Sequence, residues 1–292
     1  MKLTDLLRLV TLVFTAVTFV VFGDTAGKLL TADGVDPIIV AWSRFGLAAL
    51  ILLPFSGLSL KELPDLLEWR VFVRSAFITG GIIFILTALK TEPIANVFGA
   101  FFIGPVVSYI LAILFLGEKP SLSRSILLAI GFIGVMLVVK PGFGGSIGLV
   151  FALVAGICYG AYLAMTRTVA GRYRPRFLLI SQLLIGSVIL TPLGLTTDLP
   201  DINLPVTLLI LVSALSSAFG NYLLVVSSKQ AEASLIAPLV YSQLISATVM
   251  GVLVFNEWPD IVSLIGLVLI AFSGFGSLLA HQRSSEKLAR QS

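Results

Sequence analysis

The sequence has 292 residues, of which 58% are hydrophobic and 12% are charged, and its formal net charge at pH 7 is +4. A soluble domain has roughly a quarter charged residues, so this chain has too little polar surface to cover a globule in water. One cysteine excludes an internal disulfide. The single histidine, His281, follows the last apolar stretch, which excludes histidine metal sites and Ser-His-Asp catalysis within a membrane.

Long stretches without Asp, Glu, Lys or Arg mark the expected membrane spans. Crossing about 30 Å of hydrocarbon takes roughly 20 helical residues, and lipid offers no partner for an open backbone. Arg44 and Arg74 are the only charges in two further stretches, 38–60 and 71–89. Ten spans fit, so the sequence predicts an all-α integral membrane protein with ten transmembrane helices. The uncharged stretches are, in chain order, 9–23, 93–117, 125–139, 141–166, 177–197, 202–228, 233–256 and 261–280.

The Lys and Arg residues orient these spans, because cytoplasmic loops are enriched in them. With the N-terminus inside, the inner segments hold 15 of the 19, a count that includes Arg74. The outer segments hold Lys28, Lys90 and Lys140, and Arg44 lies within the second span. We therefore expect both termini in the cytoplasm and the protein in a bacterial inner membrane. Topology accounts for the net charge, so we expect no nucleic-acid partner.

The two halves of the chain resemble each other. Each half holds five spans, an odd number, so the second copy must enter the membrane in the opposite direction. Inverted repeats with a site at their interface are typical of transporters. We expect two inverted five-helix repeats, residues 1–140 and 141–281, and a cytoplasmic tail, residues 282–292. The equivalent pairs, at offsets of 137 to 139, are Phe22 with Tyr159, Pro37 with Pro175, Lys90 with Lys229, Glu118 with Glu257 and Pro120 with Pro259.

Glu118 and Glu257 lie in the similar turns LFLGEKPS and LVFNEWPD. Each glutamate precedes a proline suited to the first turn of the next helix, where a carboxylate also complements the helix dipole. We interpret both as turn elements, with a gating or proton-carrying role as the alternative.

Several motifs resemble those of a known family. WSRFGLAALILLP and IGPVVSYILAILFLGEKP, followed by Gly131 and Gly134, resemble the first EamA-type unit of the drug/metabolite transporter superfamily. APLVYSQLISATVMGVLVFNEWP is similar to the second unit, although Leu244 stands where the first copy has Pro105. The resemblance covers nearly the whole chain and is greatest to amino-acid and metabolite exporters, including the aromatic amino-acid branch. It implies ten helices, a central cavity lined mainly by helices 1, 3, 4, 6, 8 and 9, and no ATPase or cofactor.

Three charged residues within spans, Asp24, Lys28 and Arg44, are candidates for function, because charge inside a membrane is costly. If the first hairpin turns near Gly34, Asp24 and Arg44 lie at similar depth and are expected to pair. The pair either serves transport or braces the first two helices, and Lys28 can extend to the surface. Near the equivalent positions of the second half stand Gln182 for Arg44, and Ala161 or Tyr162 for Asp24.

Polar and aromatic residues within apolar spans are the candidates for substrate binding. Buried amides need partners, either another helix or a substrate, and aromatic rings suit the wall of a pocket. Packing within the bundle is the alternative for each. The small pairs Gly23/Gly27 and Gly156/Gly160 indicate close helix crossings. The candidate substrate-binding residues are Asn96, Phe98, Tyr159, Asn221, Tyr241 and Gln243.

Taken together, the sequence predicts a secondary transporter, not an enzyme, that exports amino acids or related small metabolites by alternating access. Its expected partners are that small-molecule substrate and the lipid bilayer. A carrier of phosphorylated or nucleotide-linked metabolites or drugs is the alternative. Phosphate groups would favour several cations in the cavity, and only Lys28 and Arg44 are available. An intramembrane enzyme would need a clustered nucleophile, base and electrophile, and a non-transporting scaffold is the remaining possibility.

Overall fold

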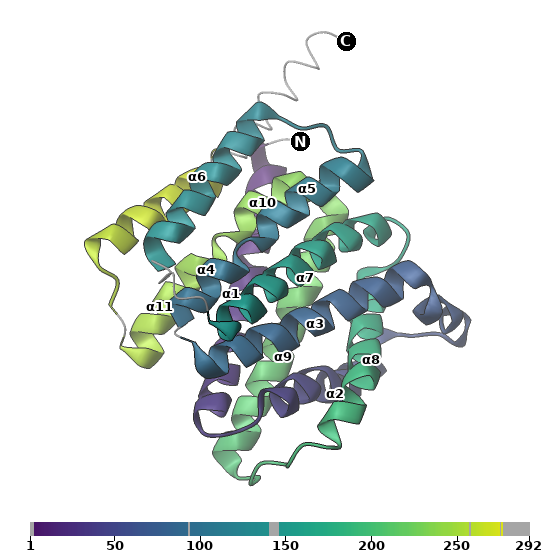
Figure 1. The fold of residues 1–292 in the computed structure, drawn as a ribbon. Coiled ribbons are helices and arrows are strands. Elements are labelled where there is room, and N and C mark those ends of the chain that lie inside the picture. Colours follow the sequence, from purple (N-terminus) through teal and green to yellow (C-terminus); the bar gives the residue numbers. More distant parts are fainter. Residues whose placement is uncertain (1–2, 93, 140–145, 257, 275, 277–292) are drawn as a thin grey trace.

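The computed structural model describes residues 3–92, 94–139, 146–256, 258–274 and 276, and over these residues the protein is built from helices without strands (Figure 1). Two short 3-10 turns, Leu60–Glu62 and Pro64–Leu67, lie between the second and third helices. A further helix covers Ile261–Gly274. The labelled helices are α1 (Leu3–Ala32), α2 (Pro37–Ser56), α3 (Trp69–Thr91), α4 (Ile94–Phe101), α5 (Gly104–Leu116), α6 (Leu122–Val139), α7 (Ile147–Ala170), α8 (Pro175–Gly194), α9 (Leu204–Gln230), α10 (Ala233–Val240) and α11 (Gln243–Phe255).

Among the described residues, eight helical segments are long and apolar enough to cross a membrane. They are α1, α2, α3, residues 97–116, α7, α8, α9 and residues 233–255. Two shorter apolar helices, Leu122–Val138 and Ile261–Gly274, accompany them. Large apolar side chains such as Leu50 and Phe115 are exposed, whereas Arg44 and Arg74 are buried. This distribution is the reverse of a soluble protein and confirms the prediction of an all-α integral membrane protein; the count of ten spans stays a prediction.

Two of the spans are broken near their middles. Residues 94–116 divide into α4 and α5, and residues 233–255 divide into α10 and α11. Pro105 accounts for the first break, because it lies in the first turn of α5 and has no N–H to continue the helix. The second break occurs 139 residues later although Leu244 replaces that proline. There the chain turns through a tight bond from the Ser242 N–H to the Leu239 carbonyl.

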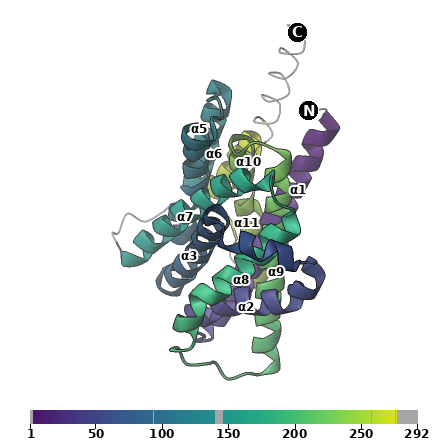
Figure 2. The ribbon, with the colours of Figure 1, turned by 90° about the vertical axis from the view of Figure 1, so that its right-hand side faces the viewer.

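Helices from the two halves of the chain pack side by side. Figure 1 shows α3 running along α7, and α1 packs along α9 and α2 along α8. In the second view, α5 and α6 stand together while α2, α8 and α9 gather at the opposite end (Figure 2). The core is therefore formed mainly between the halves and not within either one.

Glycines permit the closest of these crossings. A Cβ on Gly156 would overlap the Phe101 carbonyl, and one on Gly160 would overlap that of Gly104, so α7 touches the backbone of α4 and α5. The predicted close crossing at Gly156/Gly160 is confirmed. On the other side of the bundle, a Cβ on Gly23 of α1 would lie 3.0 Å from the carbonyl oxygen of Ser213 in α9.

Candidate functional site

An ion pair lies inside the bundle where α1, α2 and α9 meet. The Arg44 Nη1 atom lies 2.8 Å from Asp24 Oδ1, which confirms the predicted pairing. Arg44 Nη2 also donates to the Gly23 carbonyl at 2.6 Å, and Nε donates to Ser213 Oγ at 2.7 Å. Ser213, in the other half, was not anticipated as a partner. Gly27 leaves space for this guanidinium, since a Cβ there would lie 2.5 Å from Nη2.

A small cavity of about 30 Å³ adjoins this ion pair. Its walls come from both halves of the chain, because α1, α2, α3 and α4 face α7, α9 and the start of α11 across it. Three of the candidate substrate-binding residues, Tyr159, Asn221 and Gln243, border it together with Asp24 and Arg44. The lining residues are Val20, Asp24, Arg44, Ile78, Gly81, Ile82, Ile85, Phe101, Tyr159, Ser217, Asn221 and Gln243.

Polar atoms in this central cavity have no partner within the protein. The Tyr159 hydroxyl, Asn221 Oδ1 and Gln243 Oε1 are all buried and accept or donate no hydrogen bond among the described residues. The Asn221 amide is oriented by its NH₂ group, which donates to the Ser217 carbonyl at 2.8 Å and leaves the oxygen unpaired. A buried polar group left unpaired costs about 1–3 kcal/mol, so a bound ligand or ordered water is expected to satisfy these atoms. Their gathering at one cavity makes it the candidate binding site.

A second cavity, of about 40 Å³, also borders Asp24. Phe98 and Lys28 line it, and the Lys28 ammonium lies 4.4 Å from the centre of the Phe255 ring. Residues of α1, α3, α4 and α11 line both cavities, and Asp24 is the lining residue that the two have in common.

Of the other two candidates, Tyr241 does not join this group. Tyr241 borders neither cavity; its ring packs edge-on against Phe102, with centroids 6.0 Å apart, and lies next to Gly131. Its buried hydroxyl also lacks a partner among the described residues. The side chain of Asn96 lies outside the described part of the structure.

Arg74 is a buried charge that the sequence interpretation misplaced. It was counted in a cytoplasmic segment, but its side chain is 0% exposed inside the bundle. It donates to Thr166 Oγ1 at 2.8 Å, to the Leu178 carbonyl at 2.9 Å and to Gln182 Oε1 at 2.8 Å. Its guanidinium also lies over the Tyr162 ring at 4.9 Å. The sequence could have indicated this burial, because Arg74 is the one charged residue of the apolar stretch 71–89, just as Arg44 is in 38–60.

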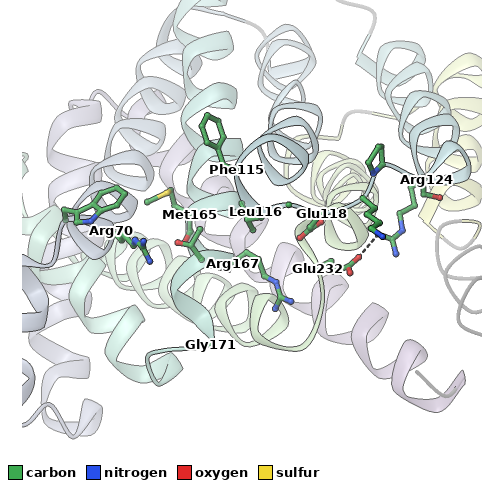
Figure 3. Close-up of a pocket in the computed structure, with 15 residues that line it drawn as sticks. Arg70, Phe115, Leu116, Glu118, Arg124, Met165, Arg167, Gly171 and Glu232 are labelled. Carbon is green, nitrogen blue, oxygen red and sulfur yellow. Dashed lines mark hydrogen bonds and ion pairs between the residues drawn. The ribbon is translucent and has the colours of Figure 1, made fainter. Parts of the chain in front are cut away.

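A wide recess of about 1150 Å³ lies between the start of α3, the end of α7 and the connection from α5 to α6 (Figure 3). At its edge, the two Glu118 carboxylate oxygens accept from the backbone N–H groups of Ala233 and Ser234 at 2.9 and 3.0 Å. These residues begin α10. Arg124 reinforces this contact through Glu232 Oε2 at 2.6 Å, as Figure 3 shows, and through Ser234 Oγ at 2.8 Å.

Glu118 lies in the turn between α5 and α6, as predicted, but the expectation that its carboxylate complements the helix after that turn is wrong. Its carboxylate caps α10, more than a hundred residues later, where the partial positive charge of the helix N-terminus attracts it. Glu257 lies outside the described residues.

A second ion pair joins two connections outside the spans. Glu62, in the turn after α2, accepts from Arg174 Nε and Nη2 at 2.7 Å each, and Arg174 precedes α8. Arg174 Nη1 also donates to the Ser56 carbonyl at the end of α2. The hydrogen bonds from Arg174, and then one from the Ser59 backbone, lower the pKa of Glu62 from 4.5 to about 2.

Comparison with known proteins agrees with this picture. The profile of the EamA-like transporter family matches residues 7–140 and again residues 146–279. An S-adenosylmethionine uptake transporter of Rickettsia bellii is 24% identical over 79% of this chain and 80% of its own length. A riboflavin transporter of Rhizobium johnstonii is 25% identical over 85% of this chain and 83% of its own length. A solved crystal structure with 17% identity superposes with a TM-score of 0.78, covering 94% of this chain and 98% of that one, which shows a shared fold.

Proposed function

Because the chain belongs to the EamA-like transporter family, we propose that it is a secondary transporter that exports amino acids or related small metabolites by alternating access. The names of its relatives indicate transport, which is a role without catalysis. The observation that carries the proposal is the group of unpaired buried polar atoms on Tyr159, Asn221 and Gln243. They meet in the middle of the bundle, where helices from both matched regions converge.

The size of the central cavity supports a carrier and not an open channel. A volume of about 30 Å³ holds a water or two but no metabolite. Binding therefore requires helices that line this cavity to separate. Such a movement about a central site is the basis of alternating access.

We place the protein in a bacterial inner membrane with both termini in the cytoplasm. Its two inverted repeats would be residues 1–140 and 141–281, with residues 282–292 as a cytoplasmic tail. The double family match and the equivalent breaks in two spans support this arrangement. Cysteines introduced at Gly34 and Asp198 should react with an impermeant reagent from outside, whereas those at Leu60 and Gly171 should not. The reverse pattern would contradict both the orientation and the inverted repeat.

A larger nucleoside- or flavin-like substrate is the second candidate, because relatives are named for S-adenosylmethionine and riboflavin. Phosphorylated substrates fit less well, since all three nitrogens of Arg44 already donate hydrogen bonds within the protein. That arrangement leaves no preformed cationic clamp at the central cavity for a phosphate group.

Counterflow in proteoliposomes distinguishes these substrates. Vesicles containing the purified protein are loaded with one solute and mixed outside with a trace of the same labelled solute. We expect accumulation with neutral or aromatic amino acids, and none in vesicles without protein. Accumulation with riboflavin or S-adenosylmethionine alone would support the second candidate. Failure with every solute, in protein that binds none of them, would contradict the proposed transport function.

A further inference from the structure

The central cavity presents several hydrogen-bond acceptors to a ligand. Asn221 Oδ1 and Gln243 Oε1 are acceptors only, and both are unpaired and buried. The Asp24 carboxylate borders the same cavity, and its Oδ1 atom is the one that Arg44 contacts. The Tyr159 hydroxyl can donate or accept. A ligand that satisfies these atoms must bring several N–H or O–H donors on a compact group.

Two donor groups in the wall are directed at oxygens of the protein itself. Arg44 is the only cation that borders the central cavity among the described residues, and each of its nitrogens donates to an oxygen of the protein. The Asn221 NH₂ group is likewise taken up by the Ser217 carbonyl. The guanidinium is thus oriented by the protein and paired with Asp24, whereas the Asn221 and Gln243 side-chain oxygens have no protein partner among the described residues and can accept from a ligand.

The rings beside these oxygens suit a cation. Phe101 and Tyr159 both line the cavity, and their ring centroids lie 5.2 Å apart. The face of an aromatic ring attracts an ammonium group, more strongly where water is excluded. Two amide oxygens, a carboxylate and ring faces together match an ammonium with its three N–H bonds.

We propose that the central cavity recognises the protonated amino group of the substrate, through Asn221 Oδ1, Gln243 Oε1 and the neighbouring Asp24 carboxylate. This inference rests on the transport function proposed above and adds which end of the substrate determines binding. The rest of the molecule extends past Asp24 into the second cavity, beside Phe98, when the helices separate. The amino group is required, and the carboxylate of an amino acid is not.

Matched ligands test this requirement on the purified full-length protein in nanodiscs, with binding measured by calorimetry. L-phenylalanine and 2-phenylethylamine have the amino group, whereas 3-phenylpropionate and N-acetyl-L-phenylalanine have no protonated amine. L-leucine, 3-methylbutylamine and 4-methylpentanoate form a second set with a smaller side chain. We expect the amines and amino acids to bind, and the compounds without a protonated amine to bind at least about 100-fold more weakly, because buried acceptors are then left unpaired.

Two outcomes would overturn the proposal. Binding of 3-phenylpropionate as tight as that of phenylalanine would show that the amino group is not recognised. Failure of both sets to bind, in protein that shows counterflow of riboflavin, which has no protonated amine, would do the same while the transport function remained supported. Absence of counterflow with any solute would instead contradict the function itself.

Variants of Asn221 and Gln243 test whether their side-chain oxygens bind the amino group. Asn221→Leu and Gln243→Leu should weaken binding of 2-phenylethylamine roughly 10- to 100-fold, since each removes a hydrogen bond to a charged group. Gln243→Glu keeps an acceptor oxygen and should retain binding. Ser108→Ala is the matched control, because its buried hydroxyl is also unpaired but borders neither cavity. Parental affinity for the amine in both folded Leu variants would contradict the assignment.

Discussion

Arg74 in α3 donates a hydrogen bond of 2.8 Å to Gln182 in α8, and Gln182 stands 138 positions after Arg44. Arg44 in α2 donates in turn to Ser213 in α9, which stands 139 positions after Arg74. Each arginine thus binds the residue equivalent to the other. The two buried clusters therefore use equivalent positions in the two halves of the chain. The arginine comes from α2 in one cluster and from α3 in the other. Among the described residues, the cluster around Arg44 is the one that contains a carboxylate, Asp24, and the one that borders the central cavity.

We expect Arg74→Ala to destabilise the protein by about 2–5 kcal/mol, because it removes the hydrogen bonds of a buried, charged guanidinium to Thr166, Leu178 and Gln182. Thermal unfolding in detergent measures the loss. Arg70→Ala, one turn earlier on the same helix at an exposed position, should change stability little. Equal effects of the two changes would show that the contacts of Arg74 contribute nothing beyond those of a surface arginine.

The ion pair can be tested by a double-mutant cycle. Arg44→Ala should cost more than Asp24→Ala and Arg44→Ala together, because the single change leaves a buried carboxylate uncompensated. Unfolding of the two single variants and the double variant gives the coupling energy. Strictly additive losses would contradict the 2.8 Å contact. Unchanged counterflow in both folded single variants would assign the pair to bracing α1 against α2.

Gly27→Ala should disturb the same pair without removing either charge. A Cβ at this position would lie 2.5 Å from Arg44 Nη2, and that guanidinium is held by three hydrogen bonds. We expect a loss of about 1–3 kcal/mol, as for other overpacked sites. Gly171→Ala is the control, since its Cβ would meet nothing within 4 Å. A Gly27→Ala variant as stable as Gly171→Ala would mean that Arg44 moves aside freely.

Loss of the Glu118 carboxylate should loosen the contact between the α5–α6 connection and α10. Removing a helix cap costs about 0.5–2 kcal/mol, so Glu118→Ala should expose the start of α10 more often and Glu118→Gln less so. With Cys158 replaced by Ala, the alkylation rate of a cysteine at Ala233, which is buried, reports this opening. The neighbouring, exposed Lys119→Ala is the control. Identical alkylation rates in the parent, Glu118→Ala, Glu118→Gln and Lys119→Ala proteins would show that the Glu118 contact does not hold the start of α10 in place.

The Glu62–Arg174 pair predicts a defined dependence of stability on pH. The pKa of Glu62 is lowered to about 2 in the folded protein, so the pair contributes stability at pH values above 4.5. That contribution declines as the pH falls from 4.5 towards 2. The difference in unfolding temperature between the parent and Glu62→Gln should therefore be constant between pH 6 and 8 and shrink below pH 4.5. A difference that grew on acidification would contradict the assigned pairing.

The sequence alone determined the class of the protein and the location of its charged centre. Uncharged stretches of about 20 residues suit lipid and little else, so the membrane assignment follows from composition. Asp24 and Arg44 are 20 residues apart on one hairpin around Gly34, and the cost of a lone charge in hydrocarbon made their pairing predictable. Polarity within apolar spans also selected Tyr159, Asn221 and Gln243, which the structure brings to one cavity. Their role in binding stays a prediction.

Only the tertiary structure decided which distant residues meet. Arg74 donates to Thr166 and Gln182, some hundred residues later, and Glu118 accepts from Ala233. These contacts form because helices of the first half pack against helices of the second half. The residues next to Glu118 in the sequence do not indicate which distant helix packs against it, so its carboxylate was assigned to the helix that follows it. Tyr241 had the same polarity signal as Gln243, two residues later. The break between α10 and α11 separates them, so Gln243 borders the cavity and Tyr241 packs against Phe102.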